Sequence, residues 1–174
     1  GEIRDTVRTV SERSGLSKMD AEAYADAISL YLGFVVSRVA DRGSTLSTWD
    51  PNPSGYAPKI RNTFARQALP MTWDFAEAFP FGTSTANATD AVGWVVKVLK
   101  GLPASRPGHA IQEDARLVSR GALVATDPPY YDNIGYADLS DFFYVWLRRS
   151  LKDVYPDLFA TMVTPKTDEL IATP

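Results

Sequence analysis

The sequence contains no cysteine and a single histidine, His109, among its 174 residues. Without cysteine there are no disulfide bonds or thiolate zinc sites, and one histidine cannot form an imidazole cluster for a metal. No window approaches the roughly 18 apolar residues of a membrane-spanning helix, so we expect no membrane partner. None of the 11 glycines forms a Gly-x-Gly cluster after a predicted strand, so the glycine loop that cradles a dinucleotide or similar cofactor is missing.

Positive charge is also scarce. The chain carries 18 Lys and Arg against 21 Asp and Glu, a net charge of −3. A stand-alone DNA-binding domain is usually basic, because phosphate contacts dominate its affinity. Either a basic DNA-binding surface lies elsewhere, or the protein does not bind nucleic acid. The chain begins at Gly1 without a methionine or a signal-peptide pattern, and we expect an internal segment of a longer cytoplasmic protein.

Residues 1–103 are predicted to be largely helical. The clearest helix covers residues 17–42, with Ser17 or Asp20 as its cap, Gly43 at its end and an apolar stripe interpreted as core. A further helix runs from Asn87 or Thr89 to about Lys100, and shorter helices are predicted within 1–15 and at 59–68. The predicted stripe of the long helix comprises Tyr24, Ile28, Tyr31, Leu32, Val35, Val36 and Val39, and the buried side of the later helix comprises Ala91, Trp94, Val95 and Val98.

Two features between these helices have alternative interpretations. The cations Lys59, Arg61 and Arg66 could meet phosphate, but a solvated helix face is favoured. The aromatic residues that follow could stack on bases, but a core or a subunit interface is favoured, because no basic residue falls between Leu69 and Gly93. These aromatic residues are Trp73, Phe75, Phe79 and Phe81.

From about residue 104 the pattern changes, and it predicts an α/β fold: a partial Rossmann-like core at 104–174, with the helical portion at 1–103 covering or extending it. Short strands are predicted at 110–111 and 121–126, and a helix at 138–151 capped by Asp138 or Ser140. The second strand ends at Asp127, where two prolines enforce an extended backbone. The C-terminal ends of strands are where open α/β sheets bind ligands.

Residues Asp127-Pro128-Pro129-Tyr130 resemble the DPPY motif of amino-methyltransferases, which methylate exocyclic amines with S-adenosylmethionine (AdoMet). The longer run 130–143, YYDNIGYADLSDFF, resembles large adenine-specific DNA methylases that carry an N-terminal domain of unknown function and, in some members, a zinc ribbon. The resemblance extends from about residue 16 to 174 and includes the stretches 61–64 and 70–77. It implies a DNA substrate, AdoMet as methyl donor, an adenine N6 acceptor, and a setting such as restriction–modification.

The resemblance assigns catalytic roles to Asp127, Pro128, Pro129 and Tyr130. The exocyclic amine of adenine is a poor nucleophile, and an enzyme can activate it with oxygen atoms that accept hydrogen bonds from its two N–H groups. The Asp127 carboxylate and the Pro128 carbonyl suit this role, and Tyr130 offers a stacking face for a base flipped out of the duplex. Further residues expected to contact the substrate are Tyr131, Asn133 and Tyr136.

For the cofactor, the pair Asp114-Ala115 resembles the acidic element that hydrogen-bonds the AdoMet adenine in this fold class, although Asp114 could equally be an ordinary surface carboxylate. The family's glycine-rich AdoMet loop precedes the region of resemblance. We therefore expect the chain to hold the amine half of the site and to lack most of the cofactor half.

Other functions remain open at this stage. The amine could belong to cytosine N4, RNA or a protein glutamine. Alternatively, the chain could be a non-catalytic helical interaction or nucleic-acid-positioning module in which Asp127 only forms a turn or caps a helix. The sequence does not specify the oligomeric state.

Overall fold

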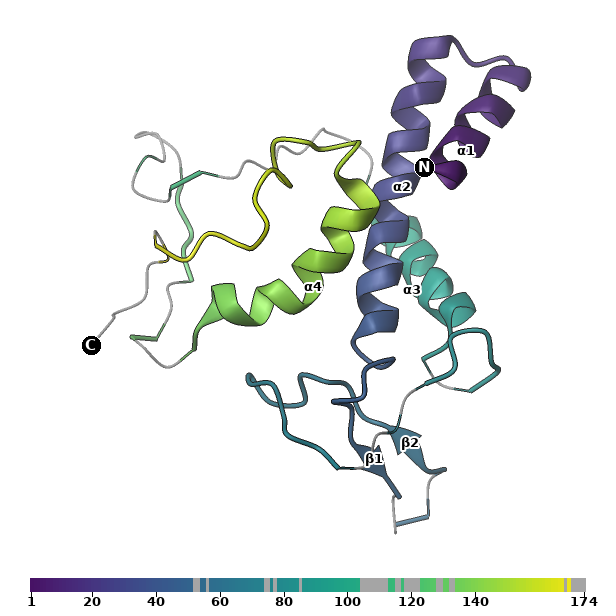
Figure 1. Ribbon diagram of the computed structural model, residues 1–174. Helices are drawn as coiled ribbons and strands as arrows, with labels where there is room; N and C mark the ends of the chain where they lie inside the picture. Colours follow the sequence, from purple (N-terminus) through teal and green to yellow (C-terminus); the bar gives the residue numbers. More distant parts are fainter. Residues whose placement is uncertain are drawn as a thin grey trace.

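The structure, a computed structural model, describes residues 1–51, 54–55, 57–73, 76, 78–84, 86–103, 113–114, 117, 123–127, 130–131, 134–167 and 169. These residues form four helices and one short hairpin (Figure 1). The long helix α2 (Lys18–Ala40) is central: α1 (Glu2–Arg13), α3 (Ala88–Gly101) and α4 (Tyr136–Leu151) each pack against it. The hairpin of β1 (Trp49–Asp50) and β2 (Lys59–Ile60) lies beyond the C-terminal end of α2.

Helix α2 starts where the sequence predicts. The Ser17 hydroxyl accepts the backbone N–H of Asp20 at 3.2 Å, and so satisfies one of the free donors of the first turn. Its fully buried face is made of small residues, with Ala21 and Ala25 one turn apart and completely inaccessible. This face lets α1 approach closely, and Arg4 of α1 pairs with Glu22 and Asp26 of α2.

The bulky stripe predicted as core is only partly buried. Within it, Val35 is buried, whereas Tyr24 is exposed and the others are half-buried. The helix also ends earlier than predicted, with Asp41 rather than Gly43 as its C-cap residue. The N–H of Gly43 still donates to the carbonyl of Val39 at 2.8 Å, which closes the last turn.

Helix α2 is long and apolar enough, by length and composition, to cross a membrane. The expectation that no window approaches a membrane span is therefore wrong for this helix. A single helix of this kind is weak evidence, because central helices of water-soluble proteins have the same length and composition. In this structure α2 is the helix against which three others pack.

Helix α3 is also capped as predicted. The Asn87 side-chain oxygen accepts the N–H of Asp90 at 2.8 Å. Its predicted buried side is mostly uncovered: Ala91 is buried, but Trp94 and Val98 are exposed. Two cations, Arg38 and Lys97, lie over the Trp94 ring at 5.6 and 5.0 Å from its centre.

The helix predicted at 59–68 is wrong. Lys59 and Ile60 instead pair antiparallel with Asp50 and Trp49. Beyond them, the N–H and the hydroxyl of Thr63 both donate to the carbonyl of Asp41, at 2.7 and 2.9 Å. In a local helix the Thr63 N–H would instead bond to a carbonyl one turn earlier in the same helix. The tertiary contacts with the end of α2 therefore override the helix propensity of residues 59–68.

The predicted α/β class, a partial Rossmann-like core, is contradicted. Within the described part of 104–174 the only regular element is α4, and the described portion of the predicted second strand, 123–126, has no strand partner. Leu123 is fully exposed, at 103% of its reference area. An apolar run becomes a buried strand only where neighbouring strands pair with it, and none is present among the described residues. The strand predicted at 110–111 lies outside the described residues.

Candidate functional site

Asp127 and Tyr130 are the described residues of the DPPY motif, and we call them, with Tyr131, the DPPY corner. Figure 1 shows the described chain that leads to α4, 123–127, on the far side of α4 from α1 and α3. The side chain of Asp127 is exposed, and Tyr130 and Tyr131 expose 73% and 71% of their reference areas. The corner thus presents a carboxylate and two aromatic rings to solvent. Pro128, Pro129 and Asn133 lie outside the described residues, so their predicted roles have no structural counterpart here.

Tyr131 has a positive φ of 57°, in the left-handed region that a bulky side chain rarely adopts. Such a conformation costs on the order of 1–2 kcal/mol unless surrounding contacts hold it. Strained residues of this kind are concentrated in ligand sites and switches, where the strain directs a side chain. Here the strained residue directly follows the motif tyrosine.

Helix α4 begins five residues after Tyr131. Ile134 and Ala137 are buried at its start, and Ala137 is bonded there to Thr164 and Glu169 of the C-terminal segment. Tyr136, the first helical residue and a predicted substrate contact, remains exposed. The corner is therefore exposed, but it is attached directly to an anchored helix terminus.

The N-terminus of α4 is not capped by Asp138 or Ser140, as the sequence predicted. Its N-cap residue is Gly135, which has no side chain, and the Ser140 hydroxyl donates instead to the Tyr136 carbonyl at 2.7 Å. The free N–H of Ala137 donates to a carboxylate oxygen of Glu169, 32 residues along the chain, at 2.9 Å. A distant carboxylate thus replaces the local cap and also complements the positive end of the helix dipole.

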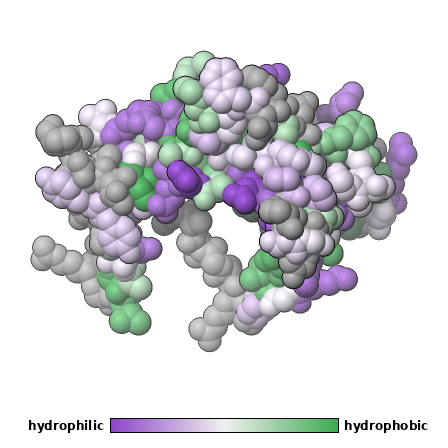
Figure 2. Space-filling view, turned by 90° about the horizontal axis from the view of Figure 1, so that it is seen from below, coloured by the Kyte–Doolittle hydropathy of each residue, from purple (hydrophilic) through white to green (hydrophobic). Residues whose placement is uncertain are grey.

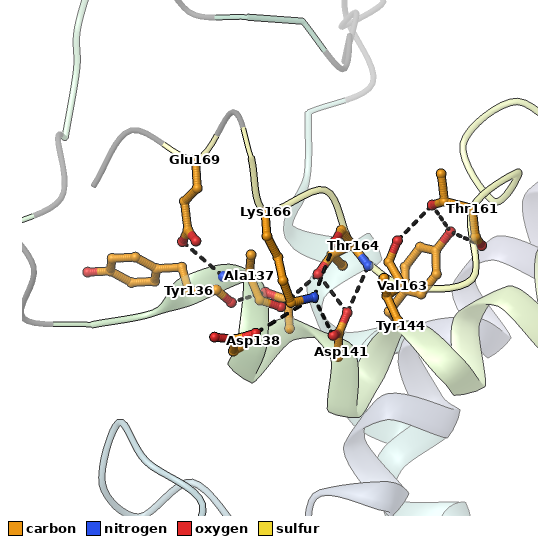
Figure 3. A network of polar contacts seen from close by, with 11 residues as sticks. Tyr136, Ala137, Asp138, Asp141, Tyr144, Thr161, Val163, Thr164, Lys166 and Glu169 are labelled. Carbon is orange, nitrogen blue, oxygen red and sulfur yellow. Dashed lines mark hydrogen bonds and ion pairs between the residues drawn. The ribbon is translucent and has the colours of Figure 1, made fainter. Parts of the chain in front are cut away.

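A network around Asp141 holds the C-terminal segment along the first turns of α4 (Figure 3). The Asp141 carboxylate accepts the Thr164 N–H at 2.8 Å, the Thr164 hydroxyl at 2.6 Å and the Lys166 ammonium at 2.6 Å. The ammonium also lies 3.7 Å from a carboxylate oxygen of Asp138. We call Asp141, Thr164, Lys166 and Glu169 the clamp, because together they tie residues 164–169 to the helix that follows the motif.

The hydrogen bonds from Lys166 and Thr164 lower the pKa of Asp141 from 3.8 to about 2. A carboxyl whose pKa is lower in the folded state stabilises the fold above its unfolded pKa. That contribution is present above pH 3.8 and is lost as the pH falls from 3.8 towards 2. The clamp should therefore open in acid.

We expect Asp141→Asn to lower the free energy of unfolding at neutral pH. The difference in stability between the wild type and the variant should shrink gradually in acid. The neutral amide cannot pair with the Lys166 ammonium, whereas the wild-type carboxylate pairs with it until it becomes protonated. Urea unfolding followed by circular dichroism between pH 7 and pH 2.5 should show wild type and variant converging below about pH 4. A stability difference that is constant over this range would contradict the assigned ion pair. Asp157→Asn, at an exposed carboxylate, is the control.

Of the predicted cofactor pair, the structure describes only Asp114. Asp114 is half-buried, and its backbone carbonyl accepts the Leu117 N–H at 2.9 Å. The strand predicted before it lies outside the described residues, so the cofactor role of Asp114 stays a prediction. Ala115 lies outside the described residues.

The sequence did not reveal the clamp. Thr164, Lys166 and Glu169 show no periodicity, and their partners lie more than 20 residues away. Among the described residues, no group of three His, Cys, Asp or Glu side chains could hold a metal ion.

The chain matches no protein-family model, no curated protein and no solved structure. The resemblance to adenine-specific DNA methylases therefore stays a sequence-based hypothesis.

Proposed function

We propose that this chain is the amine-side part of an AdoMet-dependent DNA methyltransferase that acts on the exocyclic N6 amine of a flipped adenine. The observation that supports the proposal most is the run from Asp127 to Phe143, which places an exposed carboxylate and exposed tyrosine rings directly before an anchored helix. The parent would be a longer cytoplasmic protein with DNA as its partner.

In this proposal the corner binds and activates the amine. The Asp127 carboxylate accepts one N–H of the amine, and a backbone carbonyl of the motif accepts the other. Both acceptors meet the positive charge that develops on nitrogen as it is alkylated. Tyr130 provides a stacking surface, an interaction worth about 1–3 kcal/mol per base.

The clamp gives the corner a fixed support. Alignment of nucleophile and methyl donor accounts for much of the rate in such reactions, and it is sensitive to shifts of about 1 Å. Glu169 bonds to Ala137, and Thr164 and Lys166 bond to Asp141, so the first turns of α4 are tied to the C-terminal segment six and ten residues after Tyr131. The acceptors thus lie next to a helix end that is held in place.

The described residues do not form an AdoMet site. The described residues contain no parallel strands and no glycine-rich turn. In this proposal the methyl donor, AdoMet, is bound by another part of the parent protein, and this chain only presents the amine.

The test is transfer of labelled methyl from AdoMet to DNA by the parent protein, with the product digested to nucleosides. Label in N6-methyladenine is the expected result. Label in N4-methylcytosine, RNA or protein glutamine would show a different acceptor for the same corner. A folded, AdoMet-binding parent that labels none of these would contradict the proposal.

A second candidate is a non-catalytic helical interaction or nucleic-acid-positioning module. The specific observation that favours it is α3, whose residues Trp94, Val96 and Val98 are exposed although a helix of this composition is normally covered. It predicts that Asp127→Ala leaves methylation by the parent intact, whereas the catalytic proposal predicts its loss.

A further inference from the structure

A second site candidate lies at the hairpin end of the molecule, away from the DPPY corner. A groove of about 600 Å³ opens between the hairpin region and residues 65–73, within the size range of about 300–1,000 Å³ typical of ligand sites. Figure 2 views the molecule from below, the side on which the hairpin lies in Figure 1. The residues that matter for its chemistry are Arg61, Arg66, Leu69, Met71 and Trp73.

The walls of the groove are held by backbone and hydroxyl hydrogen bonds. Thr63, which is almost completely buried, bonds twice to the Asp41 carbonyl, as described above. The N–H of Arg61 donates to the Thr48 carbonyl at 2.9 Å, and the Thr72 hydroxyl donates to the Thr45 carbonyl at 3.1 Å. Because both sides are tied to the chain that follows α2, the groove exists before any ligand arrives.

The groove is cationic, although the chain as a whole is acidic. Arg61 and Arg66 both line it, and none of the described lining residues is acidic. Arg61 pairs with Asp50 at 3.1 Å but leaves 54% of its side chain exposed. Arg66 is exposed and makes no hydrogen bond or ion pair with any residue that the structure describes. Arg66 therefore offers a guanidinium that is available to an incoming anion.

An uncovered aromatic ring stands beside these cations. Trp73 exposes 80% of its reference area, and Met71 is similarly exposed. The sequence favoured a core or interface role for this tryptophan, because no cation follows it nearby. The core interpretation is wrong for Trp73, and the fold brings it to the same groove as Arg61 and Arg66, which precede it in the chain.

We propose that this groove binds single-stranded nucleic acid, with Trp73 stacking on a base and Arg66, assisted by Arg61, contacting the phosphates. A free aromatic face next to guanidinium groups is the combination by which single strands are bound without base pairing. A paired duplex keeps its bases stacked on one another and so offers no free face to Trp73. An acidic peptide would engage the arginines but would gain no base stacking. The site goes beyond the methyl-acceptor corner and requires neither AdoMet nor Asp127.

The experiment measures binding of a fluorescently labelled 12-nucleotide single-stranded DNA to the chain by anisotropy, without AdoMet, between 50 and 200 mM salt. Trp73→Ala should weaken binding roughly ten-fold, the effect of removing one stacked base. Arg66→Ala should weaken binding and reduce the slope of log K against log salt by about 0.7, the loss of one phosphate contact on a single strand. Both side chains are exposed, so circular dichroism should confirm that both variants fold.

Two matched controls carry the same substitutions elsewhere. Trp146→Ala removes an exposed tryptophan of α4, and Arg13→Ala removes an exposed arginine of α1; neither residue lines this groove. Both should leave the affinity and the salt slope unchanged. Equal effects of controls and groove variants, or no binding by wild type at 50 mM salt, would overturn the proposal. Displacement of the DNA by an acidic peptide of equal charge at equal concentration would assign the groove to acidic peptides instead.

This result is separate from the methylation assay. Loss of DNA binding on Trp73→Ala with no methyl transfer by the parent would support the groove and contradict the proposed function. Methyl transfer by the parent that requires Asp127 but is unaffected by Trp73→Ala, together with no binding of single-stranded DNA by the chain, would support the proposed function and contradict the groove.

Discussion

Asp127→Ala is expected to reduce methyl transfer by the parent protein by about 10²–10³-fold, with the fold unchanged. The carboxylate is proposed to accept an N–H of the amine as charge develops on nitrogen, and loss of one such prearranged group typically costs 10²–10³ in rate. Asp127 is exposed, so its removal should not disturb packing. The measurement is the initial rate of label incorporation into DNA, beside circular dichroism of both proteins.

The control for this substitution is Asp157→Ala, at another exposed carboxylate, which should retain the wild-type rate. Asp127→Asn should be less severe than Asp127→Ala, because the amide oxygen still accepts a hydrogen bond. Equal rates for Asp127→Ala and wild type would make the motif a structural turn and would favour the non-catalytic module.

Leu151→Ala is expected to cost about 2–5 kcal/mol in the free energy of unfolding, the range for emptying a fully buried leucine site. Leu151 ends α4 and is only 2% exposed. It packs where α4 crosses α2: a Cβ atom built on Gly33 would lie 3.0 Å from its Cδ1. Since small domains are stable by about 5–15 kcal/mol, the variant should unfold at much lower urea concentration. Leu158→Ala, at a half-exposed leucine, should stay within about 0.5 kcal/mol of wild type.

Gly33 offers an internal check on this packing. In the wild type, Gly33→Ala places a methyl group against Leu151 and should be neutral or destabilising. In the Leu151→Ala background the same change fills vacated space and adds helix propensity of about 1 kcal/mol, so it should stabilise. Additive effects in this double-mutant cycle would contradict direct contact between the two residues.

The helices that sequence predicted best are those with local start signals. Ser17 and Asn87 cap α2 and α3 as expected, because an N-cap needs only the residues that follow it. The strand at 121–126 failed because a strand requires distant partners, which the apolar run Leu123–Val124 does not specify. The same limit explains the helix predicted at 59–68, which gave way to bonds between Thr63 and Asp41.

Long-range polar contacts account for the features of the site that sequence missed. Glu169 caps α4 from 32 residues away, and Lys166 meets Asp141 across 25 residues. Neither pairing follows from spacing or periodicity. The groove at Trp73 was also missed. Its cations, Arg61 and Arg66, precede the tryptophan in the sequence, and only the fold shows that all three residues line one groove. In contrast, the exposed residues of the corner, Asp127 and Tyr130, were selected from the motif alone.

Central to the proposed function is that this chain binds the acceptor amine of the substrate and does not bind the methyl donor. Calorimetric titration of AdoMet into the 174-residue chain, beside the same titration of the parent protein, tests it most directly. We predict micromolar binding by the parent and no heat of binding for the isolated chain. Micromolar binding by the isolated chain would contradict the claim, because it would require a complete cofactor site within these residues.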